Sequence, residues 1–237
     1  KFEDNTNDLV DVIVGADGMF SNTRSFFDKK KNEPKFKSAI AVRTILKTKP
    51  ELNINEDKIN LMMGKNCHLV IYPINKNKDL NLVCIVRSKK YDPDNIRPVI
   101  DKVTRQNPNL KKVFEGDVKS WPLYATPKIF SSSNNKVFYI GDAFNGFLPT
   151  LAQGAVQSIE SASELFSLLK DENLDSQRNY FLKRSKKVKI VKRRSNFNFF
   201  VFHFSSAIMQ IIRNFFMKFL LKRKSFISSY LCSVYKN

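Results

Sequence analysis

The sequence has 237 residues, of which 42% are hydrophobic and 27% charged, so it is long enough to bury a sizeable core. Its formal net charge is +19, which is compatible with a nucleic-acid partner, an anionic membrane surface or a lysine-rich solvated exterior. The three cysteines, Cys67, Cys84 and Cys232, have neither metal-site spacing nor a pairing pattern, which argues against a disulfide scaffold and favours a reduced, cytoplasmic setting.

The first elements expected along the chain are a strand and a short helix joined by a tight turn. Residues 9–14 form an apolar run that predicts a strand. The turn after it contains Asp17 and Gly18, and Ser21 is a suitable N-cap for a helix that has Arg24 in its first turn. An aspartate followed by a glycine is most often a simple turn, and the position at a strand end leaves ligand binding as the alternative.

Apolar runs separated by turn-rich spacers make up the next part of the chain and favour an antiparallel sheet. Four of these runs are predicted strands, namely residues 39–46, 59–63, 69–74 and 80–86. The last two are separated by five residues, a spacing that is typical of a hairpin loop. Two helical stretches, residues 94–105 and 110–114, are predicted to follow them.

Several side chains of this region have functional chemistry. Arg43, His68 and Tyr72 lie on the predicted strands and are suited to contact a small-molecule substrate. An exposed strand position for Arg43 and a strand-end position for His68 are the simpler interpretations, so substrate contact is the alternative for each. Trp121 and Tyr124, further along the chain, are expected to be packing residues.

The most informative stretch, residues 137–169, is predicted to form a strand, a loop and a helix. Its strand, residues 137–140, is a short apolar run that Gly141-Asp142 ends. Apolar residues then recur along one helical face, at Ala155, Ile159, Ala162, Phe166 and Leu169. The helix begins at Gln153-Gly154, where the first backbone N–H groups have no partner within the helix. A carboxylate at a strand end that faces a helix N-terminus suits a ligand with hydroxyl groups and an electron-rich end.

The last part of the chain is basic and rich in phenylalanine. Residues 183–194 carry eight lysines and arginines in twelve positions, and Leu182, Val188 and Val191 would line a buried stripe. A solvated helix face is therefore the simpler interpretation of the basic run, and a binding patch is the alternative. In the tail, residues 196–221, polar residues dilute the longest uncharged run, which argues against a membrane-spanning helix. A helix packed on the core is the first expectation, and peripheral membrane contact through a helix with basic flanks is the alternative.

Four of these segments resemble, in the same order, motifs of class A FAD-dependent aromatic-ring monooxygenases, the group that contains salicylate and hydroxybenzoate hydroxylases. One is similar to the family's ADGxxSxxR segment and comprises residues 16–24. Another is similar to the second flavin motif and comprises Gly141-Asp142-Ala143, Pro149, Ala152-Gln153-Gly154-Ala155 and Ile159-Glu160. Residues 67–73 and 121–124 are similar to further family landmarks, so the resemblance runs from about residue 10 to about residue 194.

The resemblance implies an α/β fold class with mixed α+β parts, in which an antiparallel β-sheet substrate domain is inserted into a Rossmann-like FAD-binding domain. It assigns residues 1–28 and 121–175 to the FAD-binding domain, 29–120 to the substrate domain, and 176–237 to basic, phenylalanine-rich C-terminal helices. The implied reaction inserts one oxygen atom of O₂ into an aromatic or similar conjugated small molecule, with FAD as cofactor and NAD(P)H as co-substrate.

The resemblance also assigns the site residues. The implied FAD contacts are Asp17, Gly18, Arg24, Gly141, Asp142, Pro149, Gln153, Gly154 and Ala155. The implied substrate contacts on the sheet are Arg43, His68 and Tyr72. Because the cofactor carries out the chemistry, the prediction includes no catalytic side chain and no metal.

Two departures from the family pattern limit the resemblance. Where the family often has a histidine this chain has Asn145, which cannot be protonated near neutral pH. A GxGxxG segment that would hold the FAD pyrophosphate is absent from the sequence. The expectation is therefore a C-terminal portion of a longer monooxygenase that is inactive alone.

Two functions from other classes are alternatives. A nucleic-acid binder is supported by the net charge, but the sequence lacks interleaved aromatic and basic residues and a recognisable binding motif, so no specific nucleic-acid partner is expected. A non-catalytic remnant or membrane-surface interaction protein is supported by the phenylalanine-rich tail. Bound oxidised flavin is yellow, so an absorbance spectrum separates the monooxygenase from both.

Overall fold

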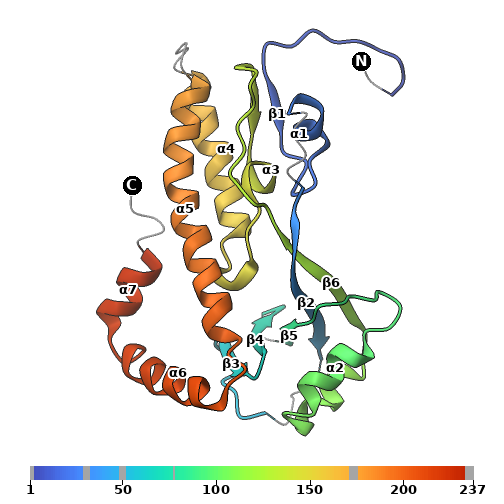
Figure 1. Cartoon of the computed structure of the whole chain (residues 1–237), viewed down its shortest axis with the longest axis vertical. Coiled ribbons are helices and arrows are strands. Elements are labelled where there is room, and N and C mark those ends of the chain that lie inside the picture. Colours follow the sequence, from blue (N-terminus) through green and yellow to red (C-terminus); the bar gives the residue numbers. More distant parts are fainter. Residues whose placement is uncertain (1–2, 29–32, 48–51, 77, 171–175, 233–237) are drawn as a thin grey trace. The chain divides into compact units, whose positions relative to one another are not determined.

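The computed structural model describes residues 3–28, 33–47, 52–76, 78–170 and 176–232. The chain divides into two compact units, each assembled from two stretches that are distant in sequence (Figure 1). The first unit combines residues Lys1–Lys35 with Tyr124–Asn196, and the second combines Phe36–Leu123 with Phe197–Asn237. The C-terminal helices, which the sequence suggested as one segment, are thus divided between the two units.

The first unit is built on two parallel strands, β1 (Ile13–Gly15) and β7 (Val137–Tyr139). The short helix α1 (Asn22–Phe27) follows β1, and the short helix α3 (Gly141–Asn145) and the 3₁₀ turn η3 (Pro149–Leu151) follow β7. Two longer helices complete the unit, α4 (Gly154–Lys170) and the part of α5 (Ser176–Phe202) up to Asn196. The predicted strand 9–14 is shorter in the structure because its partner β7 offers three residues for pairing.

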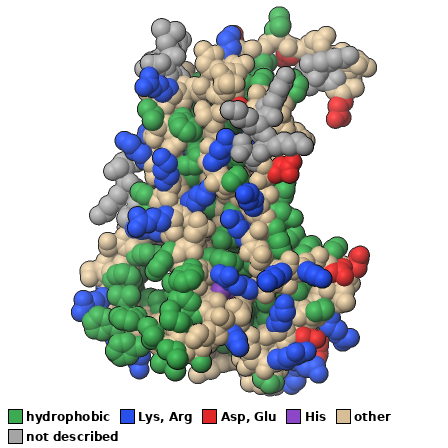
Figure 2. All heavy atoms as spheres, in the orientation of Figure 1, with side chains coloured by type: hydrophobic (Ala, Val, Ile, Leu, Met, Phe, Trp, Pro, Cys, Tyr) green, Lys and Arg blue, Asp and Glu red, His purple; other side chains and the backbone are tan. Residues whose placement is uncertain are grey.

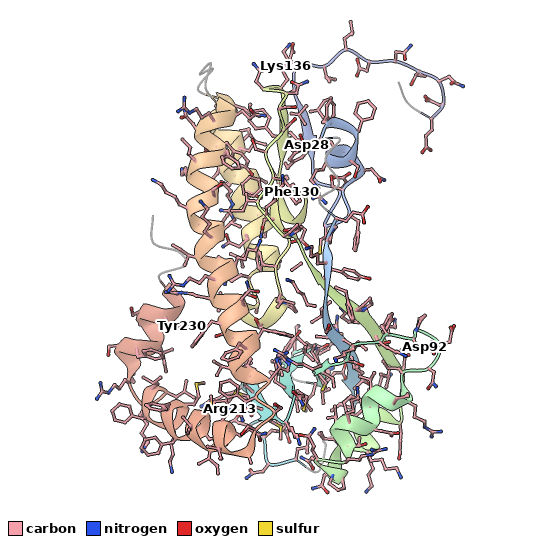
Figure 3. All side chains as sticks on the ribbon, viewed as in Figure 1. Asp28, Asp92, Phe130, Lys136, Arg213 and Tyr230 are labelled. Atoms are coloured by element: carbon pink, nitrogen blue, oxygen red, sulfur yellow. The ribbon has the colours of Figure 1, made fainter. Side chains whose placement is uncertain are left out.

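Helix α5 packs on β7 through polar and apolar contacts. Phe130, Tyr139, Phe144, Tyr180 and Val188 belong to one buried cluster. Figure 3 labels Phe130 in the first unit. The Tyr180 hydroxyl donates to the carbonyl oxygen of Tyr139 at 3.1 Å, which ties the helix to the end of the strand. The predicted buried stripe of the basic run is confirmed at Val188 and Val191 and wrong at Leu182, which is exposed.

Helix α4 has the predicted bounds to within a residue, and Leu169 of its predicted apolar face packs against the core. The rest of that face was wrongly assigned to the core. Gln157, Ser161 and Leu165 are buried, whereas Ile159 and Phe166 are exposed. The physical reason is that α4 uses polar side chains to contact its neighbours. Ser161 Oγ accepts from the backbone N–H of Gly141 at 3.0 Å, and Gln157 is bound by Arg184 of α5.

The second unit contains a five-stranded sheet in the order β3-β4-β5-β2-β6. Its strands are β2 (Lys35–Leu46), β3 (Asn60–Gly64), β4 (Cys67–Ile74), β5 (Asp79–Arg87) and β6 (Val118–Ala125). The predicted hairpin is confirmed, because β4 and β5 pair antiparallel from Cys67↔Val86 to Ile74↔Asp79.

Strand β6 was not predicted from the sequence. Trp121 on β6 is exposed, and the Tyr124 ring lies 5.2 Å from that of Phe20.

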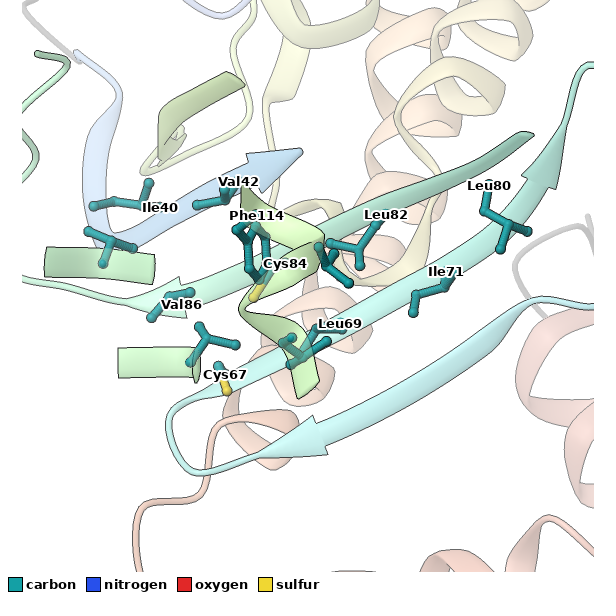
Figure 4. Packing of buried hydrophobic residues seen from close by; sticks show 14 residues of the cluster. Ile40, Val42, Cys67, Leu69, Ile71, Leu80, Leu82, Cys84, Val86 and Phe114 are labelled. Atoms are coloured by element: carbon teal, nitrogen blue, oxygen red, sulfur yellow. The ribbon is translucent and has the colours of Figure 1, made fainter. Parts of the chain in front are cut away.

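One face of this sheet forms the core of the second unit (Figure 4). Alternate residues of β2, β4 and β5 pack there, including Ile40, Val42, Leu69, Ile71, Leu82 and Cys84. Helix α2 (Arg97–Thr104) and two 3₁₀ turns, η1 (Pro108–Leu110) and η2 (Lys112–Phe114), cover this face with Val99, Val103, Leu110 and Phe114. The helix predicted at 110–114 is therefore a pair of 3₁₀ turns.

The phenylalanine-rich tail forms the end of α5 and two further helices, α6 (Ala207–Leu220) and α7 (Lys224–Cys232). The predicted core packing is confirmed for Phe199 and Phe202, which are buried, and is wrong for α6, where Phe215, Phe216 and Phe219 are exposed. In the part of the chain that the structure describes, no helix is both long and apolar enough to cross a membrane.

Candidate functional site

The candidate site of the first unit lies where β1 and β7 end. Because the two strands are parallel and Gly15 is in register with Tyr139, the loops that follow them leave the same edge. The loops also approach closely. A Cβ on Gly15 would lie 3.0 Å from the Tyr139 ring, and a Cβ on Gly146 would overlap the Met19 side chain. The fold thus brings two segments together that are more than 100 residues apart.

Asp17 holds the first loop in shape. Its carboxylate accepts hydrogen bonds from the Ser21 hydroxyl at 2.5 Å, from the backbone N–H of Thr23 at 2.8 Å and from the Thr23 hydroxyl at 3.0 Å. Burial acts to raise the pKa of Asp17, but these hydrogen bonds outweigh it and the pKa lies below its ordinary value. Gly18 next to it has φ +81°, and a Cβ there would meet open space. Asp17 is therefore a charged group that shapes the loop.

Arg24 joins the two loops. Its guanidinium is buried and donates to the carbonyl oxygen of Ala143 at 2.8 Å and to that of Met19 at 2.6 Å. It also lies over the Phe130 ring, 4.0 Å from the ring centroid. The side chain predicted to contact the cofactor is thus engaged with protein groups that fix one loop against the other.

The short helix α3 after β7 carries Gly141 and Asp142, where the sequence predicted a loop. Asp142 is half-buried, and its carboxylate makes no hydrogen bond or ion pair with the residues that the structure describes. Burial raises the pKa of its carboxyl group above the ordinary value. A carboxylate that has lost part of its hydration and has no protein donor is suited to accept hydrogen bonds from the hydroxyl groups of a ligand.

The N-terminus of α4 is the second polar feature of the site. Ala152 has φ +53°, a left-handed conformation that is uncommon for alanine and turns the chain from η3 into α4. The first hydrogen bond of α4 runs from the N–H of Gln157 to the carbonyl oxygen of Gln153. The N–H groups of Gly154 and Ala155 therefore lie in the turn that has no partner within the helix. A Cβ on Gly154 would meet open space, so a ligand has room to approach.

Side chains of α5 fix this helix start. Arg184 is only 1% exposed and donates to the Gln157 side-chain oxygen at 2.5 Å and to the Gln157 carbonyl oxygen at 2.7 Å. Gln157 in turn donates to the Gln153 side chain at 3.2 Å. Pro149 is exposed on η3, and the next residue, Thr150, donates to the carbonyl oxygen of Ser195 at 2.6 Å. Sequence reasoning missed Arg184 because it is one of eight basic residues in a run.

Asn145 occupies the position where the resembled family often has a histidine. It is buried, and its side-chain oxygen accepts from the Thr126 hydroxyl at 3.1 Å and from Lys192 Nζ at 3.2 Å. Its amide nitrogen has no partner among the described residues. The side chain can therefore donate a hydrogen bond, but it cannot transfer a proton near neutral pH.

The sheet of the second unit brings the three predicted substrate contacts to one face. Arg43, His68 and Tyr72 point to the face opposite the core, as strand alternation requires. Arg43 is exposed, and its Nε donates to the side-chain oxygen of Asn81 at 2.5 Å. Asn81 is 0% exposed and is in register with Tyr72, and its amide nitrogen has no partner in the described part of the chain. Asn81 is a polar residue of this face that sequence reasoning missed.

His68 lies deeper than the other two. Its ring is 2% exposed and packs against Phe202 and His203 at the end of α5. Its Nδ1 lies 3.1 Å from His203 Nε2. This packing supports the structural interpretation of His68, and its contact with a substrate stays an untested prediction. Among the described residues, no group of three or more His, Cys, Asp or Glu side chains could hold a metal ion.

A match to the sequence model of a protein family shows which family the chain belongs to. The model described as squalene epoxidase matches residues 10–231, nearly the whole chain. The chain belongs to the squalene epoxidase family.

Relatives of this family member are hydroxylases and monooxygenases. The 3-amino-4-hydroxybenzoate 2-monooxygenase of Streptomyces platensis is 26% identical over 226 residues, which cover 90% of this chain and 57% of the relative. The salicylate hydroxylase of Pseudomonas putida is 25% identical over 202 residues, which cover 74% of this chain and 46% of the relative. The predicted resemblance to salicylate and hydroxybenzoate hydroxylases is thus confirmed. The chain spans about half the length of these curated relatives.

Two solved structures share the fold of this family member. Klebsiella pneumoniae HpxO, solved with FAD and uric acid, superposes with a TM-score of 0.81 at 15% identity, covering 98% of this chain and 61% of HpxO. A salicylate hydroxylase substrate complex superposes with a TM-score of 0.70 at 18% identity, covering 97% of this chain and 65% of that one. At such identities the likeness concerns the fold alone, and it confirms the predicted mixed α/β class.

Proposed function

We propose that the chain acts in a FAD-dependent monooxygenase, which uses NAD(P)H and O₂ to insert one oxygen atom into an aromatic or similar conjugated small molecule. The observation that carries the proposal is the pairing of an unpartnered, half-buried Asp142 with the open N-terminus of α4, on a chain whose relatives are aromatic hydroxylases. When bound, FAD would supply the redox chemistry, so the protein has to provide position and electrostatics.

The residues present fit the flavin end of FAD. Asp142 would accept hydrogen bonds from the ribityl hydroxyl groups, because its carboxylate has no described protein donor. The N–H groups of Gly154 and Ala155 would face the pyrimidine edge of the flavin, where preorganised amides stabilise negative charge. Pro149 would shape the loop beside the ring, and the Gln153 side chain would stay with Gln157.

The loop of Asp17, Gly18 and Arg24 would lie beside the pyrophosphate. In this proposal Asp17 and Arg24 act mainly by holding the loops, because their polar atoms bond to Ser21, Thr23, Met19 and Ala143. Gly18 would let the cofactor approach, since no atom lies within 4 Å of its Cβ position. Loss of the Arg24 guanidinium would therefore weaken FAD binding indirectly.

The substrate would lie against the sheet face that carries Arg43, Tyr72 and His68. Arg43 and Asn81 offer hydrogen-bond donors there, and the unpartnered Asn81 amide supports a polar group on the substrate. A step that relies on an imidazole at position 145 is not part of the proposal, because Asn145 has no titratable group.

A titration with FAD tests the proposal. Each protein is co-expressed with a βαβ segment that carries a GxGxxG turn, and flavin fluorescence is followed as the unmodified chain or the Asp142→Ala variant is added. Asp94→Ala, at an exposed aspartate of the second unit, is the matched control. We expect Asp142→Ala to weaken binding about 10- to 100-fold, because a hydrogen bond to a charged group contributes roughly 1.5–3 kcal/mol. Equal affinity of a folded Asp142→Ala variant and the control would remove Asp142 from the site.

The proposal also includes the cellular location of the protein and its macromolecular partners. A cytoplasmic location is supported by Cys67 and Cys84, which are buried and unpaired. Peripheral contact with a membrane is supported by the exposed apolar side chains of α6. A specific nucleic-acid partner is not proposed, because buried Val188 and Val191 dock the basic stretch of α5 on the protein.

A further inference from the structure

Lys192 is a basic residue of α5 that points into the protein instead of into solvent. Figure 2 shows lysine and arginine side chains along α5, on the side of the molecule turned to the viewer. Lys186 and Lys189 are among the exposed ones, whereas Lys192 is partly buried. The Lys192 Nζ donates to the carbonyl oxygen of Thr126 at 2.9 Å and to the side-chain oxygen of Asn145 at 3.2 Å. Its charge is thus directed at the end of α3.

The contact with Lys192 fixes the orientation of the Asn145 amide group. A lysine ammonium group has only donors, so the amide atom that faces it has to be the oxygen. The Thr126 hydroxyl donates to the same oxygen at 3.1 Å. The amide nitrogen therefore lies on the other side, where it has no partner among the described residues. Asn145 is 2% exposed, and a buried donor without an acceptor lowers stability, so this nitrogen is suited to an acceptor on a ligand.

The segment that follows Asn145 is held from the side of α5. The backbone N–H of Gly146 donates to the Thr126 hydroxyl at 3.1 Å, and the N–H of Thr126 donates to the carbonyl oxygen of Gly146 at 2.9 Å. The hydroxyl of Ser195, on α5, donates to the carbonyl oxygen of Leu148. A ligand of this segment would therefore approach from the side opposite α5.

Helix α3 places Asn145 beside the proposed flavin site. Asp142 and Asn145 are three residues apart in this helix, so their side chains leave the same face, roughly 4.5 Å apart along the axis. The Asp142 carboxylate is proposed above to accept from the ribityl hydroxyl groups, and Pro149, four residues after Asn145, to lie beside the ring. Asn145 is thus at the position where the chain passes from the ribityl group to the ring.

We propose that the Asn145 amide nitrogen donates a hydrogen bond to an acceptor atom of the flavin ring, and that Lys192 is the positioning residue that orients this amide. This inference rests on the proposed function and adds a contact to its flavin site. Reduction increases the negative charge on the ring acceptors, so a donor with a cation behind it stabilises reduced flavin more than oxidised flavin. The pair should therefore raise the reduction potential of bound FAD.

The reduction potential tests this inference, because it depends on the affinity for reduced flavin relative to that for oxidised flavin. The full chain is co-expressed with the βαβ segment used in the FAD titration, and the potential is measured against a reference dye. Asn145→Asp keeps an oxygen for Lys192 and Thr126 but removes the donor. Lys192→Met removes the orienting cation, and Lys189→Met, at an exposed position of the same helix, is the matched control. Circular dichroism verifies that each variant is folded.

We expect Asn145→Asp to weaken the binding of reduced flavin at least about tenfold more than that of oxidised flavin, which lowers the two-electron potential by about 30 mV or more. Lys192→Met should lower the potential by a similar amount, because the amide then loses the cation that fixes its orientation. Lys189→Met should change the preference less than about twofold, because solvent and salt screen an exposed charge.

Other outcomes overturn different parts. If the unmodified preparation binds no FAD, the proposed function fails and this inference fails with it. If Asn145→Asp weakens the binding of both flavin forms equally and leaves the potential unchanged, Asn145 supports the loop and does not contact the ring. If Asn145→Asp lowers the potential and Lys192→Met does not, the ring contact stands and Lys192 is not its positioning residue. If Asn145→Asp does not fold, Asn145→Ala replaces it with the same expected direction of shift.

Discussion

Gly141 shows how one residue without a side chain determines the geometry of the candidate site. Its φ of +57° is a left-handed conformation, and a Cβ there would lie 2.8 Å from Ser158 Oγ on α4. Its backbone N–H donates to Ser161 Oγ at 3.0 Å. Glycine therefore allows the loop with Asp142 to lie directly on α4.

Gly141→Ala should destabilise the protein by roughly 1 to 3 kcal/mol, because it adds backbone strain and a steric overlap. Gly116→Ala is the matched control, since a Cβ at Gly116 meets no atom within 4 Å and its φ is not left-handed. Urea unfolding of the two variants measures the difference. Equal unfolding midpoints would contradict the strained geometry at Gly141.

The two histidines of the chain form a buried pair. His203 Nδ1 lies 2.6 Å from the carbonyl oxygen of Phe199, and His203 Nε2 lies 3.2 Å from that of Ile85. His203 Nε2 also faces His68 Nδ1 at 3.1 Å, in a buried space near the cations of Arg87 and Arg213. Burial first, and then the neighbouring His203, lowers the pKa of His68 to about 3.

Acid should therefore destabilise the second unit through His68. Since the folded pKa is below the unfolded value of 6.5, the unfolded state binds the proton more readily, and stability falls as the pH drops from about 6.5 towards 3. The slope from this residue should be about 1.4 kcal/mol per pH unit. Unfolding free energies between pH 7.5 and 5, measured with His68→Gln for comparison, check this. An equal slope for the variant would assign the acid sensitivity to other groups.

At the scale of elements, α4 and α5 are joined by a buried polar network. Arg184 Nη1 lies 3.2 Å from a Glu160 carboxylate oxygen and 3.4 Å from that of Glu164. Its other terminal nitrogen donates twice to Gln157. Lys187 adds a contact of 3.2 Å with Glu160. The start of α4, where the cofactor is proposed to bind, is thus held by α5.

Arg184→Met should lower the free energy of unfolding by about 3 kcal/mol, because it leaves the buried oxygens of Gln157 and Glu160 without their donor. The expected value lies at the low end of the usual range since Lys187 still faces Glu160. Lys186→Ala, at an exposed position two residues along the same helix, should change stability by no more than about 0.5 kcal/mol. Denaturant unfolding compares the two. Equal losses of unfolding free energy in the two variants would mean that the network does not stabilise the α4–α5 pair.

At the scale of the whole molecule, the residues proposed to bind FAD would contact only part of that cofactor. The sequence contains no GxGxxG segment for the pyrophosphate and the adenine end. Among the described residues, strands β1 and β7 form a two-stranded sheet, and Ile159 and Phe166 of α4 are exposed. A sheet edge and an apolar helix face of this kind favour association.

The 237-residue chain expressed alone should therefore hold FAD below one equivalent and show no NAD(P)H oxidation. Co-expression with a βαβ segment that carries a GxGxxG turn, taken from a related hydroxylase, should restore the yellow colour. Absorbance spectra of both preparations measure the flavin content. A monodisperse, stoichiometric flavoprotein from the chain alone would show that these 237 residues are sufficient.

Local sequence signals and tertiary contacts determined different features of this protein. The sequence by itself determined the elements with local signals, namely the strand and helix around Gly141 and Gly154 and the hairpin of β4 and β5. These follow from apolar periodicity and glycine positions, which act over a few residues. The family followed from the resemblance of four motifs to those of known hydroxylases.

Only the tertiary structure decided which faces are buried and which polar groups pair. The periodicity of residues 155–169 predicted an apolar inner face for α4, yet Ile159 points outward, because Arg184 binds oxygens of Gln157 on the inner side. The tail was expected to pack on the core, yet Phe215 of α6 is exposed, and Arg213 binds the carbonyl oxygen of Phe202 instead. A buried arginine with its acceptors can outweigh an apolar stripe, and its acceptors lie on elements distant in sequence. Such pairing depends on the meeting of those elements in space, which no local pattern records.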